Sequence, residues 1–270
     1  MKLPVNRFLF WGLFVVATPF LFIACDNSFD PSGPDNGTFS IHGTLDLLEE
    51  KSYIRVRDLN APFTLEATED LDAVVTLQNL RSGVSTTLGS TVREFEGVYL
   101  HTFQVSDGVV PDTPYLLRVE NSNGDLVELE TLTPTLPEPQ INRENDACTT
   151  PLNLVFDPMK GGTLVIRFGL EPDTPDQKGR WGRLIELGPS TYTNRVSITV
   201  NPLITAQGIA GTFGVCSSLL TRGNIYVAIA HYSPGFYEKL NEDLTNILQT
   251  TRQFGGFYAD TLAIPIDASQ

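Results

Sequence analysis

Short runs in which apolar and polar residues alternate fill residues 38–133. In FSIHGTLDL, apolar side chains such as Phe39 and Ile41 share one face of an extended chain, because successive side chains of a strand point to opposite sides. Five further runs follow this pattern: SYIRVRDL, DAVVTLQNL, GVYLHTFQV, TPYLLRVEN and DLVELETL. Turn-forming residues separate the runs, as in NSNG at 121–124. Six or seven short strands in about 95 residues predict an immunoglobulin-like β-sandwich.

A second β-rich domain is predicted over residues 148–270. The segment before it, 134–147 (PTLPEPQINRENDA), contains three prolines and predicts a linker. The run NIYVAIAHY is apolar on both faces, which indicates a central strand. Ser233-Pro234 opens one amphipathic helix, predicted over 234–252, and GFYADTLAIPI after Gly255 is typical of a closing strand.

The amino terminus follows a different pattern. Lys2 and Arg7 precede 16 largely apolar residues, Phe8 to Ile23, which is fewer than the ~20 that a helix needs to cross a bilayer. Acidic residues follow this run, where a membrane span usually has basic ones. The run also lacks the A-x-A-like cleavage site of an ordinary secretory signal. Both the membrane span and the ordinary signal are therefore disfavoured.

The end of this run, Leu21-Phe22-Ile23-Ala24-Cys25, resembles the lipobox of bacterial lipoproteins, with Phe22 where leucine is usual. The resemblance implies that residues 1–24 are a signal peptide. It also implies that Cys25 is diacylated on sulfur, becomes the first residue and is acylated on its new amine. Several acyl chains on one residue suffice for stable anchoring in a membrane. Residues 25–37 then form a flexible tether, because they are too polar to fold, and their aspartates lack the spacing of a calcium loop.

Two further resemblances concern the β-rich blocks. The series GVYLHTF, PDTPYLLRVENSNGD and TLTPTLP resembles the prealbumin-like modules of Gram-negative surface lipoproteins. The order strand, SPGFYEKL helix, GGFY strand resembles the carboxy-terminal part of an uncharacterised family of Gram-negative lipoproteins, known chiefly as a domain of unknown function. Members of that family often occur in envelopes rich in TonB-dependent transporters. The resemblance implies an outer-membrane location and an integral outer-membrane protein as partner, and it brings no catalytic residues and no cofactor.

The charge balance narrows the possible partners. The chain has 18 Lys and Arg against 32 Asp and Glu, a net charge of −14. Such a surface repels phosphate backbones, so no nucleic-acid partner is expected. It also repels anionic headgroups, so membrane attachment has to come from the acylated Cys25 rather than from basic residues.

The other two cysteines form an even pair once Cys25 carries the lipid. In an oxidising compartment Cys148 and Cys216 are expected to form one disulfide, and the alternative is two free buried thiols. No Cys or His spacing is typical of zinc, and no metal site is predicted.

Motifs for catalysis are missing, and no catalytic residue is assigned. The histidines lie on separate predicted strands and are interpreted as strand-face residues. The acid pairs Glu94/Glu96 and Glu128/Glu130 share strand faces, so they suit either a glycosidase-like site or solvated edge charges. Seven aromatic residues lie in or near the predicted helix: Tyr226, Tyr232, Phe236, Tyr237, Phe254, Phe257 and Tyr258. They suit either a binding platform or the packing of the helix on a sheet.

One candidate binding surface stands out. Trp181 lies between glycines in GRWGRL, a predicted loop, and is accompanied by Arg180 and Arg183 in a chain poor in basic residues. The leading hypothesis is a non-catalytic adaptor of an outer-membrane system. The rivals are a carbohydrate- or polymer-binding surface module and an envelope hydrolase.

Overall fold

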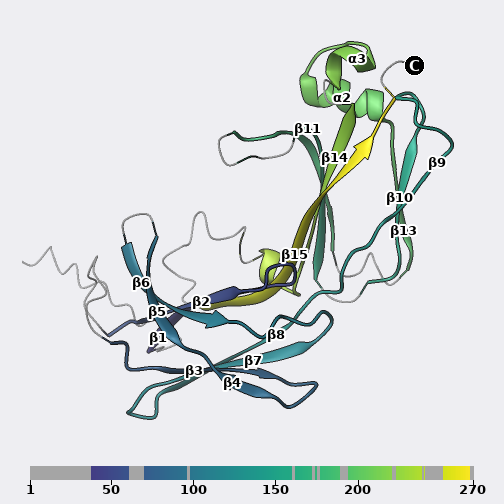
Figure 1. Ribbon diagram of the computed structural model, residues 1–270. Coiled ribbons are helices and arrows are strands. Elements are labelled where there is room, and N and C mark those ends of the chain that lie inside the picture. Colours follow the sequence, from purple (N-terminus) through teal and green to yellow (C-terminus); the bar gives the residue numbers. More distant parts are fainter. Residues whose placement is uncertain are drawn as a thin grey trace, which may run out of the picture. The chain divides into compact units, whose positions relative to one another are not determined.

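The computed structural model (Figure 1) describes residues 38–60, 70–95, 98–159, 162–171, 174, 177–188, 194–220, 223–238, 240 and 252–267. They belong to one compact unit, Gly37–Gln270. The strands before residue 134 are β1 (Phe39–Asp46), β2 (Ser52–Asp58), β3 (Val74–Asn79), β4 (Ser85–Thr87), β5 (Ser90–Phe95), β6 (Val98–Val105), β7 (Pro114–Glu120) and β8 (Leu126–Leu132). The later elements are β9 (Gln140–Arg143), β10 (Leu152–Phe156), β11 (Thr163–Glu171), β12 (Arg180–Leu187), β13 (Val196–Val200), α2 (Pro202–Ala210), α3 (Cys216–Leu219), β14 (Asn224–Tyr232) and β15 (Arg252–Pro265).

The strands form three sheets. The largest has eight strands in the order β12-β11-β14-β15-β1-β2-β6-β5, and the others have the orders β4-β3-β7-β8 and β13-β10-β9. All pairings between named strands are antiparallel except that of β1 with β15, which is parallel. The long strand β15 pairs with β14 on one side and β1 on the other, so it joins early and late parts of the chain in one sheet (Figure 1).

The amino-terminal block is a sandwich, which confirms the predicted mainly β fold. The alternation in β1 buries Phe39, Ile41 and Leu45 completely, as the sequence pattern requires. These side chains share one core with residues of the four-stranded sheet, such as Val75 and Leu117. Two sheets that bury their apolar faces against each other are the defining feature of a β-sandwich.

The later block has its own core. Apolar residues of β11 and β14, such as Ile166 and Val227, pack with Leu154 and Phe156 of β10. Strand β14 lies between β11 and β15, and its residues are all buried or half-buried. The central position predicted for NIYVAIAHY is therefore confirmed.

The predicted linker, 134–147, differs from the structure in its middle. Residues 140–143 form β9, which pairs with β10. Prolines at 134, 137 and 139 all precede this strand, so its ladder hydrogen bonds are unaffected. The eight-stranded sheet contains strands from both sides of this segment, so the sheet does not separate the two predicted domains. The division into two domains stays a prediction.

Buried hydrogen bonds also connect the two blocks. The Ser233 side chain donates to the Leu132 carbonyl of the amino-terminal block over 2.8 Å, and it accepts from the Gly256 amide of its own block over 2.6 Å. His231 is fully buried, and its Nδ1 lies 2.8 Å from the Thr135 carbonyl oxygen. Each bond satisfies a polar group that would otherwise be buried without a partner.

The predicted helix 234–252 is only partly described. Residues 236–238 and 240 are helical, 234–235 form a turn, and 241–251 lie outside the described residues. The predicted end is wrong by one residue, since Arg252 begins β15. Gly255 and Gly256 lie inside that strand and not at a helix terminus. None of the helices in the described part of the chain is long and apolar enough to span a membrane.

Candidate functional site

The cysteine prediction is confirmed for the pair that the structure describes. Cys148 and Cys216 form a disulfide with their Cα atoms 6.2 Å apart, within the usual range. Both residues are buried in the later core. Cys25, the predicted lipid attachment site, lies outside the described residues.

The loop predicted around Trp181 is wrong, because Trp181 lies in the edge strand β12. A side chain added at Gly169 would meet the indole ring at 2.6 Å, so one face of Trp181 covers the β11 backbone. The Arg167 guanidinium lies 5.7 Å from the ring centre. Arg180 is exposed, and the side chain of Arg183 is not among those that the structure describes. Much of Trp181 is therefore used in packing.

Close packing explains why a glycine, Gly182, follows Trp181. A Cβ at this position would lie 2.3 Å from Cγ1 of Ile209, a residue of α2. The glycine lets α2 approach strand β12 closely, so here it marks packing and not a turn.

The described acid-pair residues and the histidines lie on different strands and are not gathered in one site. Glu94, Glu128 and Glu130 are exposed, Glu128 forms an ion pair with Arg118 over 2.9 Å, and Glu96 lies outside the described residues. His42, His101 and His231 lie in β1, β6 and β14, respectively. In the described parts of the chain, no group of three or more His, Cys, Asp or Glu is arranged to hold a metal ion.

The aromatic residues near the predicted helix pack against one another. The rings of Tyr232 and Tyr237 lie 5.1 Å apart, and Tyr232 stacks with Phe257 at 6.2 Å. Burial raises the pKa of Tyr232. The pKa of Tyr258 is also raised, first by burial and then by the charge of Asp260 and a hydrogen bond to it. Both hydroxyls therefore stay protonated at neutral pH, as packed tyrosines do.

Two short helices, absent from the prediction, form a surface that we call the apolar cap, residues 201–220. Asn201 caps α2 by accepting from the Ile204 amide over 3.2 Å, and Pro202 is at its first turn. Gly211 ends the helix at φ 66°. The Asn-Pro start and Gly end are the signals that predict this helix. They are easy to miss because the helix carries no acidic residue in its first turn and no basic residue in its last.

Three large apolar side chains of the cap are exposed. Ile204 and Val215 are each 67% exposed, and Phe213, between the two helices, is 93% exposed. Singly exposed apolar residues are ordinary, but three of them on one short segment make this segment a candidate interaction surface.

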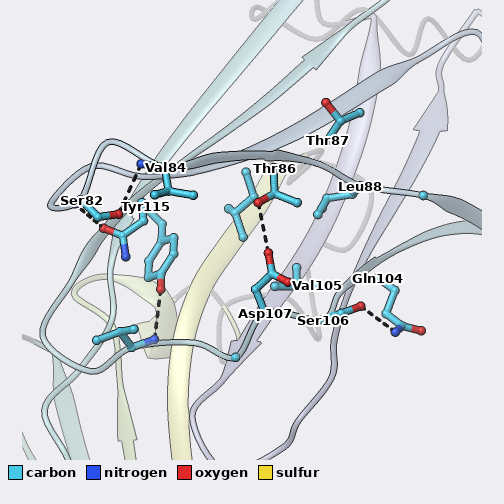
Figure 2. Close-up of a pocket in the computed structure, with 15 residues that line it drawn as sticks. Ser82, Val84, Thr86, Thr87, Leu88, Gln104, Val105, Ser106, Asp107 and Tyr115 are labelled. Atoms are coloured by element: carbon cyan, nitrogen blue, oxygen red, sulfur yellow. Dashed lines mark hydrogen bonds between the residues drawn. The ribbon is translucent and has the colours of Figure 1, made fainter.

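The end of the sandwich holds a cleft of about 370 Å³, the sandwich cleft, formed by residues 77–89 and 104–115 (Figure 2). Buried Leu77, Val105 and Tyr115 are among the residues that line it. Figure 2 shows Asp107 and Thr86 pointing toward one another, with the hydroxyl donating to the carboxylate over 3.2 Å. Among the described residues that line the cleft, Asp107 alone carries a charge.

Hydrogen bonds hold the walls of the sandwich cleft. The Tyr115 hydroxyl accepts from the Val110 amide over 3.0 Å, and Gln104 donates to Ser106 over 2.9 Å (Figure 2). The cleft is thus a preformed hollow with hydroxyl, amide and carboxylate groups at its rim. These groups are available to hydrogen-bond a ligand.

Comparison with known proteins finds only distant likenesses to solved structures. No protein-family model and no curated protein sequence matches the chain. A pullulanase from Anoxybacillus sp. LM18-11 is 10% identical at a TM-score of 0.26, and the match covers 72% of this chain and 24% of the pullulanase. The chicken CNTN1 FN1–FN3 domains are 11% identical at a TM-score of 0.26, covering 84% of this chain and 65% of that one. The ectodomain of mouse nectin-like molecule 4 (Ig1–Ig3) is 10% identical at 0.23, covering 85% and 65%. Likenesses this distant carry no argument about function.

Proposed function

We propose that this chain is a lipoprotein of a Gram-negative envelope, anchored in the outer membrane through acylated Cys25. It works without catalysis, as a binding or adaptor component for an integral outer-membrane protein. The lipobox-like sequence before Cys25 and the polar segment after it support the anchor. The disulfide fits an exported protein, because such bonds persist in oxidising compartments.

The sandwich cleft is the observation that carries the binding part of the proposal. Its volume of about 370 Å³ falls in the range of roughly 300–1,000 Å³ that is usual for ligand sites. The core of the sandwich fixes its walls, so the cleft does not have to form on binding. Asp107 gives a basic side chain of a partner loop one charged acceptor at the mouth.

A photo-crosslinking residue in place of Val84 tests the adaptor role in intact cells. Val84 lines the cleft and is 61% exposed, so the label reaches a bound partner without disturbing the core. We expect one integral outer-membrane protein to be captured. Adding Asp107→Ala should reduce its yield by ~5-fold or more, because a charged contact is lost.

The matched control carries the same label at Val74, which is 58% exposed and begins strand β3. Val74 is not among the residues that line the cleft. Equal capture of the same abundant proteins from both positions would count against an adaptor.

A carbohydrate- or polymer-binding module is the second candidate. The hydroxyl and amide groups at the rim, from Ser82, Thr86 and Gln104, also suit a ligand rich in hydroxyl groups. Such a ligand would leave the label at Val84 without a protein partner. Binding of a glycan at Trp181 would change the tryptophan fluorescence, and this change would be absent in Trp181→Ala. Binding of a glycan in the cleft would not be affected by that substitution.

A further inference from the structure

The apolar cap lies in the part of the chain with the fewest charges. Residues 196–221 are 26 consecutive positions without Asp, Glu, Lys or Arg, in a chain with a net charge of −14. Ile204, Phe213 and Val215 are the large apolar side chains that this segment exposes. The rest of the chain is acidic and is repelled by anionic surfaces, whereas this segment approaches an apolar surface without desolvating a charge.

The cap is held in a fixed form. The disulfide attaches the first residue of α3 to Cys148, and α2 packs on β12 where Gly182 meets Ile209. Gln207 donates to the Gly214 carbonyl over 3.1 Å, which ties the segment between the helices back to α2. The exposed side chains therefore have little freedom to turn inward, and binding costs less conformational entropy.

We propose that the apolar cap docks on the surface of a lipid bilayer and places Phe213 among the acyl chains. A protein partner fits the cap less well, since 196–221 contains none of Arg, Tyr and Trp, the residues that are most enriched among binding hot spots. An anionic surface fits it less well too, because the segment has no basic residue. The docking surface is thus the neutral, apolar part of a membrane.

This inference rests on the lipid anchor of the proposed function. Three apolar side chains are too few to hold an acidic protein of 270 residues on a bilayer without help. An acylated Cys25 supplies that help, because the 12 residues at 26–37 span at most ~40 Å when extended. The tether keeps the start of β1 within that distance of the bilayer, so a weak second contact of the protein with the membrane is effectively intramolecular. The cap then sets which face of the anchored protein meets the membrane.

Tryptophan fluorescence tests the docking on the full chain, purified from envelopes and reconstituted into phosphatidylcholine vesicles. The emission spectrum of the unsubstituted protein is subtracted from that of the Phe213→Trp variant. The remaining emission, which comes from position 213, should shift to the blue in the presence of vesicles. Lipids brominated in the acyl chains should quench it at least ~3-fold more than the emission of the control Val74→Trp, because only the cap reaches the acyl region. Val74 is 58% exposed and lies in β3, outside the cap.

Three results would overturn the proposal. Quenching of Trp at 213 no greater than at 74 would show that the cap stays in water. Quenching only in vesicles that contain phosphatidylglycerol would show an anionic site, whereas we expect equal or weaker quenching there. A blue shift in native envelopes that is absent from protein-free vesicles would assign the cap to a protein partner.

Failure of the anchor is distinguishable from failure of the cap. If the same sample shows Cys25 without acyl chains, the proposed anchor is wrong. The full chain is then held on vesicles with nickel-chelating lipids through an amino-terminal histidine tag. The same quenching of Trp at 213 is expected there, and its absence would refute the docking independently of the anchor.

Discussion

Replacing Cys148 and Cys216 together with alanine is expected to lower the free energy of unfolding by about 4 kcal/mol. The disulfide joins residues 68 positions apart, so its loss restores a large loop entropy to the unfolded chain. Alanine suits both buried positions because it introduces no polar group. Urea unfolding followed by circular dichroism measures the change, and thiol reduction of the unsubstituted protein should have a similar effect.

Cys25→Ser is the matched control for the disulfide variant. Cys25 is the remaining cysteine of the chain and is predicted to carry lipid, not to support the fold. Its replacement should leave the unfolding midpoint in detergent unchanged. A loss below ~1 kcal/mol in the double alanine variant would show that the disulfide contributes little to stability.

Gly255→Val is expected to lower the free energy of unfolding by about 3 kcal/mol or more, the cost of overpacking a buried site. A Cβ at position 255 would lie 2.2 Å from Cγ of Phe236, a ring that is almost fully buried. Valine favours strands, so the loss comes from displacing Phe236 and not from the backbone of β15. Thermal and urea unfolding measure it.

Gly89→Val is the control for this steric effect. A Cβ added at Gly89 would meet no atom within 4 Å, so the change should lie within about 0.5 kcal/mol of zero. Equal destabilisation at both glycines would contradict a role for Gly255 in admitting Phe236.

Much of the strand content is predictable from the sequence because it depends on local alternation. Strand β1 buries every second residue over most of its length, and the pattern of FSIHGTLDL shows this directly. The parallel pairing of β1 with β15 is not predictable in this way. Its partners, such as Ile41 and Arg252, lie about 210 residues apart, and alternation does not encode which strands become neighbours.

Glycines caused two of the errors. The glycine at 182 supports the wrong prediction of a loop, and the helix predicted up to 252 leaves Gly255 outside any strand, but both glycines lie in strands where another side chain needs the space of a Cβ. A sequence shows that a glycine is present, not whether a turn or a close contact requires it.

The two candidate binding surfaces could not be predicted from the sequence either. The sandwich cleft combines residues of separate strands, and the apolar cap depends on which side chains the fold leaves exposed.

The disulfide was predictable because assigning Cys25 to the lipid leaves one even pair. That step links the structure to the central claim, the proposal that Cys25 anchors the chain in a membrane. The buried bond between Cys148 and Cys216 leaves Cys25 as the one cysteine outside that pair.

Mass spectrometry of the mature amino terminus, on protein isolated from envelopes, tests this claim most directly. The account predicts that the first residue is Cys25, carrying acyl chains on its sulfur and on its new amine. An intact Met1, or an unacylated terminus beyond Cys25, would contradict it.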